Sequence, residues 1–535
     1  MRFCPDFIVY HARIYRPGKG FHSATALLVY RNRILLMGTD QEMLSYRCPN
    51  THTVNAAGHL ILPAFMDSHT HFLGYARRKL ELDLSHTNSV EQALDQIRQR
   101  VQQTPPGEWI VGGGWDVNRW HLSHFPHRQL LDAISSDHFI ALESKDWHTF
   151  WVNSRVLQHL GIHRSSPEPD GGVIQRDAHG EPTGILQENA TLPVRAAIPF
   201  PGWETLFPAF LEAQRELHQL GMGSIHSMET PDEFAFYQRL LREQKMQMRV
   251  FWYAPVQNLT DLERLKISAP FGTNQLQLSG IKIFSDGSLG SHTAWLLEPY
   301  TGTAHRGVPV VQEEELAKLI ERAILRHLNC AVHAIGDAAN RMVLRVFARF
   351  ARESRQRGLR HRIEHAQLIH PDDFPLFGKS GVIASVQPIH LPGDIKLIQS
   401  YWVGRERFAY AFRSLLEGGA RLIFGSDTPI YPFNPWHSIY VALERRAPDA
   451  ATEPFFPNEK LDLSTTLQAY TRQSALAVGM ENQLGDLQPG MLADFFIPDR
   501  DITAVSPQEI SDTRSLFTVV NGKIVWQTEP FLEEP

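Results

Sequence analysis

Eight apolar stretches of strand length in the middle of the chain constrain its fold more than any other feature. They cover residues 60–66, 221–228, 246–254, 276–284, 329–335, 359–365, 382–387 and 421–425. Helical candidates such as residues 313–328 and 340–358 lie between most of them. Alternation of strand and helix is typical of a parallel α/β fold, and eight repeats are the number of a TIM-type (β/α)8 barrel. An open doubly wound sheet is the alternative, but no G-x-G-x-x-G motif follows residue 66.

The two ends of the chain and one long interval depart from this alternation. Residues 1–62 and 480–535 carry short β-type runs, which predict a small β-sandwich domain built from both termini. The barrel is then expected over residues 63–479. Its first two strands are separated by about 150 residues, where one crossover needs only a few tens. We therefore expect a large insertion at about residues 75–212, over the mouth of the barrel.

The composition narrows the class of protein. With 43% hydrophobic and 21% charged residues the chain is typical of a globular protein, and its net charge of −6 does not favour a nucleic-acid partner. No apolar run approaches the roughly 20 residues of a membrane helix, and the N-terminal stretch has no signal-peptide core. Three scattered thiols, Cys4, Cys48 and Cys330, predict neither a disulfide framework nor a cysteine zinc site. We expect a cytoplasmic protein with a small-molecule substrate; a homo-oligomer is compatible with the sequence.

Metal-ligating residue types collect where the expected barrel strands end. In MDSHTHF, His69 and His71 are two apart, so that an extended backbone places both side chains on one face. His333, His365 and Asp427 follow the fifth, sixth and eighth strands. One histidine near a strand end is more often a core or surface residue. Four histidines and an aspartate that converge at the catalytic end of a barrel predict a metal site.

Lys282 lies inside the fourth apolar run, between Ile281 and Ile283. Because barrel strands are buried on both faces, a lone ammonium group there would cost several kcal/mol. Alternation places Lys282 and Phe284 on one face, and if that face is the interior, Lys282 points into the site. A buried lysine loses its proton readily, and the neutral amine can take up carbon dioxide to form a carbamate that bridges two cations. A salt bridge with Asp286 is the alternative.

The segments LPAFMDSHTHF, GIKIFSDGSLGS, VHAIGDAAN, HRIEHAQ and GSDTPIYP together resemble the amidohydrolase superfamily, in the amidohydrolase 3 branch that contains N-substituted formamide deformylase. The resemblance spans almost the whole chain. It implies a two-metal site with His69, His71 and Asp427 on one ion, His333 and His365 on the other, and carboxylated Lys282 as the bridge. Two departures are visible: Ala64 stands where such enzymes often have glycine, and His292 stands where arginine is usual.

The chemistry follows from this ligand set. Histidine and carboxylate suit zinc best, although manganese, iron or cobalt also fit. Two such ions hold and activate a bridging water, with Asp427 as the base that accepts its proton and the acid that passes it to the leaving nitrogen. The sequence therefore predicts a metal-dependent hydrolase of a non-peptide, amide-type carbon–nitrogen bond. A mononuclear deaminase on the same scaffold and a non-catalytic binding protein are the alternatives.

Residues outside the ligand set predict contacts with the substrate. Four polar side chains are the candidates: His148, Asn153, Gln387 and His390. The first two belong to an insertion that also carries Trp115 and Trp151. The tryptophans have an alternative role, in packing the insertion against the barrel.

Overall fold

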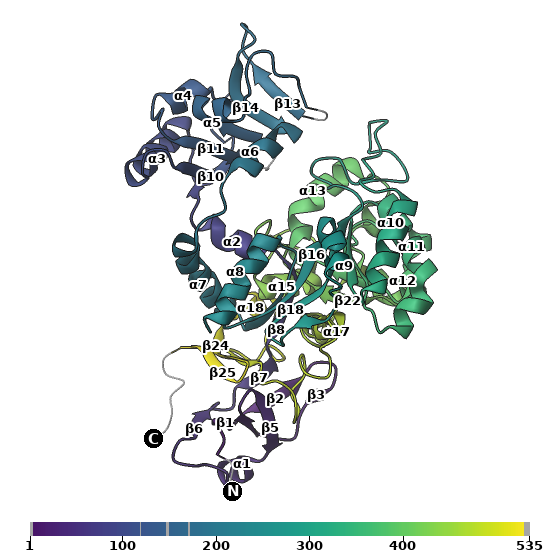
Figure 1. The fold of residues 1–535 in the computed structure, drawn as a ribbon. Coiled ribbons are helices and arrows are strands. Elements are labelled where there is room, and N and C mark those ends of the chain that lie inside the picture. Colours follow the sequence, from purple (N-terminus) through teal and green to yellow (C-terminus); the bar gives the residue numbers. More distant parts are fainter. Residues whose placement is uncertain (1–3, 118, 123, 146–148, 170–171, 529–535) are drawn as a thin grey trace. The chain divides into compact units, whose positions relative to one another are not determined.

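The computed structural model describes residues 4–117, 119–122, 124–145, 149–169 and 172–528. The chain divides into two compact units (Figure 1). The larger unit contains residues 1–75 and 211–535, and the smaller unit contains residues 76–210.

Eight parallel strands of the larger unit form a nearly closed barrel, which confirms the expected α/β class and TIM-type architecture. In sheet order the strands are β8 (Phe65–Thr70), β15 (Met222–Ser227), β16 (Arg249–Pro255), β18 (Leu276–Phe284), β19 (Asn329–Ala334), β20 (Arg362–His365), β21 (Ile383–Val386) and β22 (Arg421–Phe424). Backbone hydrogen bonds join the first strand to the segment after the last. The amide of Asp427 donates to the carbonyl of His69 at 2.7 Å, and the amide of His71 donates to the carbonyl of Thr428 at 2.8 Å.

The first apolar run is split between two sheets, which corrects the expectation of one strand over residues 60–66. β7 (Leu60–Pro63) pairs outside the barrel with β2 (Arg13–Arg16) and β23 (Phe495–Pro498), and only Phe65–Thr70 pairs with β15. Every residue of both strands is buried. Apolar content alone cannot divide a run that is buried on both faces throughout, so the break has no signal in the local sequence pattern.

Helices follow the barrel strands and surround them (Figure 1). The two helices expected from periodicity form as α10 (Glu313–Leu325) and α11 (Asp337–Gln356). The others are α2 (Phe72–Arg78), α7 (Trp203–Gln219), α8 (Pro231–Arg242), α9 (Leu259–Arg264), α12 (Phe374–Ser380), α13 (Leu391–Tyr401), α14 (Phe412–Glu417), α15 (Pro435–Glu444), α16 (Leu463–Tyr470) and α17 (Arg472–Ala477). Among the described residues, none of these helices has the length and hydropathy needed to cross a membrane.

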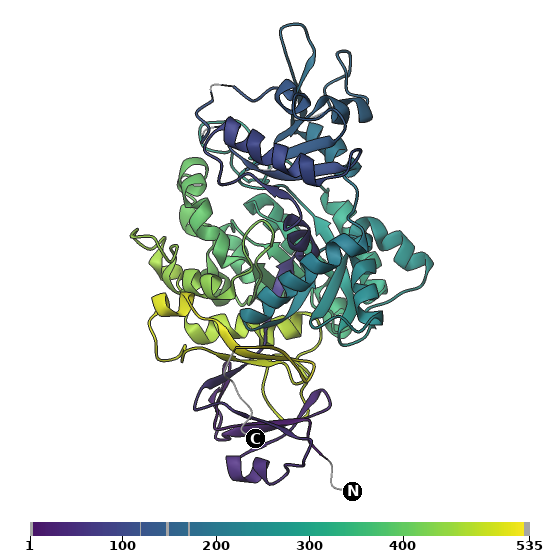
Figure 2. The ribbon, with the colours of Figure 1, turned by 90° about the vertical axis from the view of Figure 1, so that its left-hand side faces the viewer.

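Strands from the two ends of the chain, purple and yellow in Figure 2, form two further sheets. One contains β1 (Phe7–Tyr10), β4 (Ala26–Tyr30), β5 (Arg33–Gly38) and β6 (His52–Asn55). The other contains β2 (Arg13–Arg16), β3 (Gly20–Phe21), β7, β23 (Phe495–Pro498), β24 (Ser515–Val520) and β25 (Lys523–Gln527). Side chains of both sheets, such as Val9, Leu27 and Phe517, share one buried apolar cluster. N-terminal and C-terminal segments therefore fold together, which burial of this cluster favours.

Cys4 and Cys48 are paired as a disulfide, with their Cα atoms 5.7 Å apart, whereas Cys330 is buried and free. This differs from the expectation of three separate thiols. β1 and β6 run parallel, with Phe7 opposite His52, so the residues before each strand arrive side by side. That pairing joins segments 44 residues apart and leaves no spacing signal in the sequence.

The smaller unit is a mixed sheet with helices. Its strands are β9 (Leu82–Asp83), β10 (Trp109–Trp115), β11 (Phe139–Ser144), β12 (Thr149–Val152), β13 (Gly172–Arg176) and β14 (Pro182–Glu188), and its helices are α3 (Val90–Gln103), α4 (Arg128–Asp132), α5 (Ser154–His159) and α6 (Leu192–Ala197). Trp115 and Trp151 are buried in one of its apolar clusters, with ring centroids 6.4 Å apart. Both tryptophans therefore belong to the core of this unit.

His361 at the start of β20 predicts a pH dependence of stability. Its Nδ1 accepts from the amide of Cys330 at 3.0 Å, and burial lowers the pKa of His361 to about 4. Unfolded histidine has a pKa of about 6.5, so below that pH the unfolded chain binds a proton that the folded chain refuses. The folded state should lose roughly 3 kcal/mol from this group as the pH falls from about 6.5 to about 4, at about 1.4 kcal/mol per pKa unit.

Thermal melts measure this effect. Between pH 7.5 and pH 4.5 the Tm of His361→Gln should fall less steeply than that of the wild type. The exposed control His305→Gln should keep the wild-type slope; parallel slopes for all three would contradict the assignment.

Candidate metal centre

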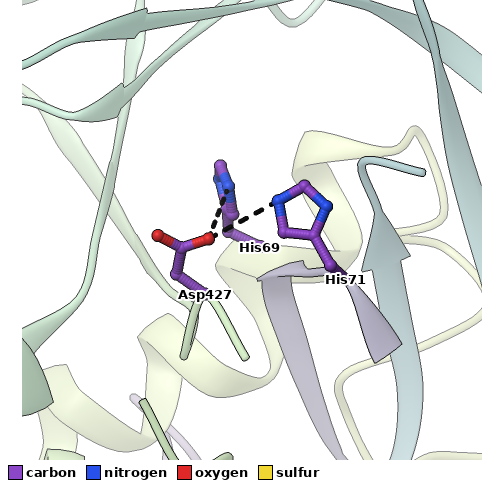
Figure 3. Close-up of side chains that lie close together, drawn as sticks. All are labelled: His69, His71 and Asp427. Atoms are coloured by element: carbon purple, nitrogen blue, oxygen red, sulfur yellow. Dashed lines mark ion pairs between the residues drawn. The ribbon is translucent and has the colours of Figure 1, made fainter. Parts of the chain in front are cut away.

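His69, His71 and Asp427 form a cluster of potential metal ligands at the carboxyl ends of β8 and β22 (Figure 3). One ligand atom from each lies within 4.8 Å of the others. Asp427 Oδ1 is 3.4 Å from His69 Nε2 and 3.6 Å from His71 Nε2. Figure 3 shows the three side chains directed at one another. Two imidazoles and a carboxylate at this separation can share one divalent ion.

Asp67 joins the two segments that supply this cluster, one from β8 and one from the turn after β22. Its carboxylate accepts from the amide of His69 at 3.1 Å, and from the amide and hydroxyl of Ser426 at 2.9 and 2.5 Å. Burial raises the pKa of Asp67 to about 6, against these hydrogen bonds, which lower it. A single buried carboxylate therefore links the first strand of the barrel to the turn that presents Asp427.

His333 and His365 lie next to this cluster. The ring centroids of His365 and His69 are 5.1 Å apart, and those of His365 and His333 are 4.6 Å apart. All four predicted histidines and Asp427 thus form one continuous group at the strand ends. Burial, the largest cause in each case, lowers the pKa of His71 to about 4 and that of His333 to about 3, and it takes the pKa of His365 well below its usual value. Neutral imidazole is the form that binds a metal.

Hydrogen bonds to the second nitrogen of three histidines select the tautomer. His69 Nδ1 is 2.5 Å from Glu364 Oε2, His333 Nε2 is 3.0 Å from the carbonyl of Gly287, and His365 Nδ1 is 2.9 Å from Gln387 Oε1. A carboxylate or backbone carbonyl can only accept, so the proton of His69 and of His333 sits on the bonded nitrogen. In the neutral form of each ring the other nitrogen then carries the lone pair, as a metal ligand requires.

Lys282 on β18 is buried, with 4% of its surface exposed. Burial lowers the pKa of Lys282 to about 8, although Glu364 and Asp427 oppose this shift. The alternative salt bridge with Asp286 does not form among the described residues. The Asp286 carboxylate instead accepts from the amides of Trp295, Ile335 and Gly336 at 2.8 to 3.0 Å. Lys282 is therefore a buried amine with a large neutral fraction near pH 8.

Two of the clustered residues have left-handed backbones. Asp427 has a φ of 60° and His365 a φ of 73°. Such conformations cost about 1–3 kcal/mol for residues other than glycine, and they gather at functional sites where the surrounding structure holds them. In Asp427 the hydrogen bond from its amide to His69 supplies that restraint.

The structure reassigns two of the residues predicted to contact substrate. Asn153 is fully buried and caps α5: its Oδ1 accepts from the amides of Ile140 and Val156, and its Nδ2 donates to the carbonyls of Ser135 and His138. Every hydrogen-bonding position of this amide is used locally, so Asn153 is a structural residue of the smaller unit. Gln387 is 1% exposed and bonds to His365 Nδ1, which makes it a support for His365.

His148 and His390 are the other two residues predicted to contact substrate. His148 lies outside the described residues. His390 is near the centre, with its ring centroid 6.5 Å from that of His365. Its Nε2 is 3.0 Å from the carbonyl of Ser426, and its ring stacks on Tyr431 at 4.3 Å.

Sequence reasoning missed Glu364, the partner of His69. It lies on β20 two residues after Arg362, and both side chains are fully buried. The signal was present in HRIEH, where two charged residues alternate within a strand of a buried sheet. The burial argument that singled out Lys282 applies equally to this pair.

Comparisons with known proteins agree with the fold and the centre. Residues 52–526 match the amidohydrolase family. The putative amidohydrolase YtcJ of Bacillus subtilis (strain 168) is 30% identical over 492 residues, which cover 90% of this chain and 92% of that protein. The N-substituted formamide deformylase of Arthrobacter pascens is 24% identical and covers 98% of each chain. The crystal structure of an uncharacterized metal-dependent hydrolase from Pyrococcus furiosus is 29% identical, with a TM-score of 0.78, and covers 92% of this chain and 99% of that one.

This chain belongs to the amidohydrolase family. It is a metal-dependent amidohydrolase, as the sequence motifs predict, and the resemblance to the branch that contains N-substituted formamide deformylase is confirmed.

Proposed function

We propose that this enzyme hydrolyses an amide-type carbon–nitrogen bond, other than a peptide bond, in a small molecule. The observation that carries this proposal is the cluster of His69, His71 and Asp427 ligand atoms within 4.8 Å of one another. The hydrogen bonds of His69 and His333 support it, because in the neutral form of each ring they place the lone pair on the other ring nitrogen.

The ligand set suits two divalent ions, and zinc best. His69, His71 and Asp427 would hold one ion, and His333 and His365 the other. Lys282 would bridge them as a carbamate, formed when its neutral amine adds to carbon dioxide and releases a proton. The burial of Lys282 supports this assignment because the neutral amine is the reactive form. Bound ions would supply a polarised carbonyl and a water of lowered pKa.

Asp427 is the proposed proton carrier of the reaction. Burial raises the pKa of its carboxyl, but His69 and its neighbours lower it more, so the pKa of Asp427 lies well below its usual value. Asp427 is therefore ionised at neutral pH and can accept a proton on a carboxylate oxygen. It would then deliver that proton to the leaving nitrogen, which departs as a neutral amine.

Three further assignments complete the proposal. His390, and His148 beyond the described residues, would contact the substrate near the metal centre. The two small sheets would form a β-sandwich, since one apolar cluster lines both. The enzyme would act in the cytoplasm.

Metal analysis joined to a substrate screen tests the function. The purified protein should contain between one and two divalent ions per chain, and it should hydrolyse a member of a library of N-formyl and N-acyl amides. Removal of the metal by a chelator should abolish turnover, and added zinc should restore it. Turnover that survives complete metal removal would contradict the proposal. One ion per chain with unmodified Lys282 and release of ammonia from a ring amine would indicate a deaminase instead.

A further inference from the structure

A chain of four buried side chains crosses the interior of the barrel behind the metal centre. His226 on β15 places its Nδ1 2.8 Å from Arg362 Nη1. The Arg362 Nε lies 2.6 Å from Glu364 Oε1 in an ion pair, and Glu364 Oε2 lies 2.5 Å from His69 Nδ1. All four residues are at most 1% exposed. None of the motifs that predicted the metal ligands includes a role for His226, Arg362 or Glu364.

The positive charge of Arg362 decides which of the atoms beside it must be hydrogen-bond acceptors. A guanidinium group only donates and keeps its charge, so the facing Nδ1 of His226 must be an acceptor. The Glu364 oxygen beside Arg362 must likewise be negative or carry a lone pair. The second Glu364 oxygen then accepts the Nδ1 proton of His69, so that in the neutral ring the lone pair is on Nε2, the nitrogen that lies 3.4 Å from Asp427 Oδ1.

We infer that Arg362 and Glu364 are positioning residues that hold His69 in the tautomer that can bind metal. The inference rests on the proposed function, since it takes His69 as a metal ligand. Arg362 acts by determining which group of residue 364 points toward it, and therefore which group points toward His69 Nδ1. The guanidinium is itself held, because it stacks 4.3 Å from the ring centroid of Tyr253 and donates to Met228 Sδ at 3.8 Å.

This arrangement predicts an unusual effect of an isosteric change. In Glu364→Gln, the carbonyl of the new amide must face the positive Arg362, so its NH2 group must face His69 Nδ1. The NH2 donates to Nδ1 and moves the histidine proton to Nε2. His69 then presents N–H to the metal, and zinc affinity should fall about 10- to 100-fold, the usual effect of losing such a support.

A second change at Arg362 should reverse the loss. In Arg362→Met with Glu364→Gln, the guanidinium no longer faces residue 364, so the amide can turn its carbonyl to His69 and restore the tautomer. The matched control is Arg362→Met with Glu364→Met, which has similar volume but no acceptor for His69 Nδ1. Both double variants remove the whole ion pair, which cores commonly tolerate better than the loss of one partner.

The test measures the zinc dissociation constant by competition with a chromophoric chelator, and the Tm, of the wild type and the three variants. We expect Glu364→Gln and the double methionine variant to bind zinc about 10- to 100-fold more weakly than the wild type. The Arg362→Met, Glu364→Gln variant should bind within a few fold of it. A purely structural effect predicts the reverse order for the double variants, because the all-apolar pair should be at least as stable as the buried amide.

Two outcomes separate this inference from the proposed function. If the wild type binds zinc and the two double variants bind it equally, the positioning role is wrong while the metal centre stands. If the wild type binds no divalent metal, the proposed function fails and the positioning role fails with it. Should Glu364→Gln not fold, the two double variants still decide the question.

Discussion

A Lys282→Ala variant is expected to lose at least about 10³-fold in kcat/KM, which is about 4 kcal/mol of transition-state stabilisation. Lys282 is the only residue in the proposed ligand set that would reach both ions. Its replacement leaves a buried cavity in β18 between groups that carry negative charge when ionised, Glu364 and Asp427. The metal content should fall from about two ions per chain to about one, and metal analysis beside steady-state kinetics measures both effects.

Chemical rescue distinguishes a bridging carbamate from a merely structural lysine. Acetate or another short carboxylic acid should restore part of the activity and of the second metal, because its carboxylate can occupy the vacated space. Lys282→Arg should not be rescued, since its guanidinium group stays charged and fills that space. The exposed control Lys318→Ala should behave as the wild type. Wild-type rate and metal content in Lys282→Ala would rule out the bridge.

Replacement of Asp427 by asparagine is expected to lower kcat by about 10³- to 10⁴-fold, toward the upper end of general acid–base effects. The amide has nearly the shape of the carboxylate and can still approach His69 and His71, but it cannot accept the proton of the attacking water. Steady-state assays with the substrate found by the library screen measure this change in kcat. Retained metal, shown by elemental analysis, would assign the loss to the proton transfer.

The matched control for this variant is Asp372→Asn. Asp372 has an exposed side chain that pairs with His370 at 3.5 Å, so its change should leave kcat within about twofold of the wild type. If Asp427→Asn keeps more than about a tenth of the wild-type kcat with its metal bound, another group must carry the proton.

The barrel, and the meeting of the candidate ligands at one rim, could be predicted because both depend on local patterns. Eight buried strands leave eight apolar runs, and strand alternation decides which neighbours share a face. His69, His71, His333, His365 and Asp427 all lie at or just after strand ends, which any parallel barrel brings to one rim. Lys282 could be singled out for a similar reason, because it is a charged residue in a segment that must be buried.

Other features could not be predicted because they depend on contacts between distant segments. Asn153 is a polar residue of a type that often contacts substrates. Backbone groups of residues 135–156 nevertheless use all of its hydrogen-bonding positions. The division of residues 60–66 between two sheets depends on β23, more than 400 residues away in the chain, and so does not appear in the local pattern.

The class of fold, the candidate metal ligands and the end of the barrel at which they lie could all be inferred from the sequence alone. Those follow from burial and from the two-residue period of a strand, which any part of the chain carries locally. The nitrogen that His69, His333 or His365 presents to the centre is instead set by tertiary contacts. That choice depends on the partner of the other nitrogen, such as Glu364 for His69 or Gln387 for His365, and these partners come from different strands. Hydrogen-bond direction is a property of atoms brought within 3 Å, and only the folded barrel brings them there.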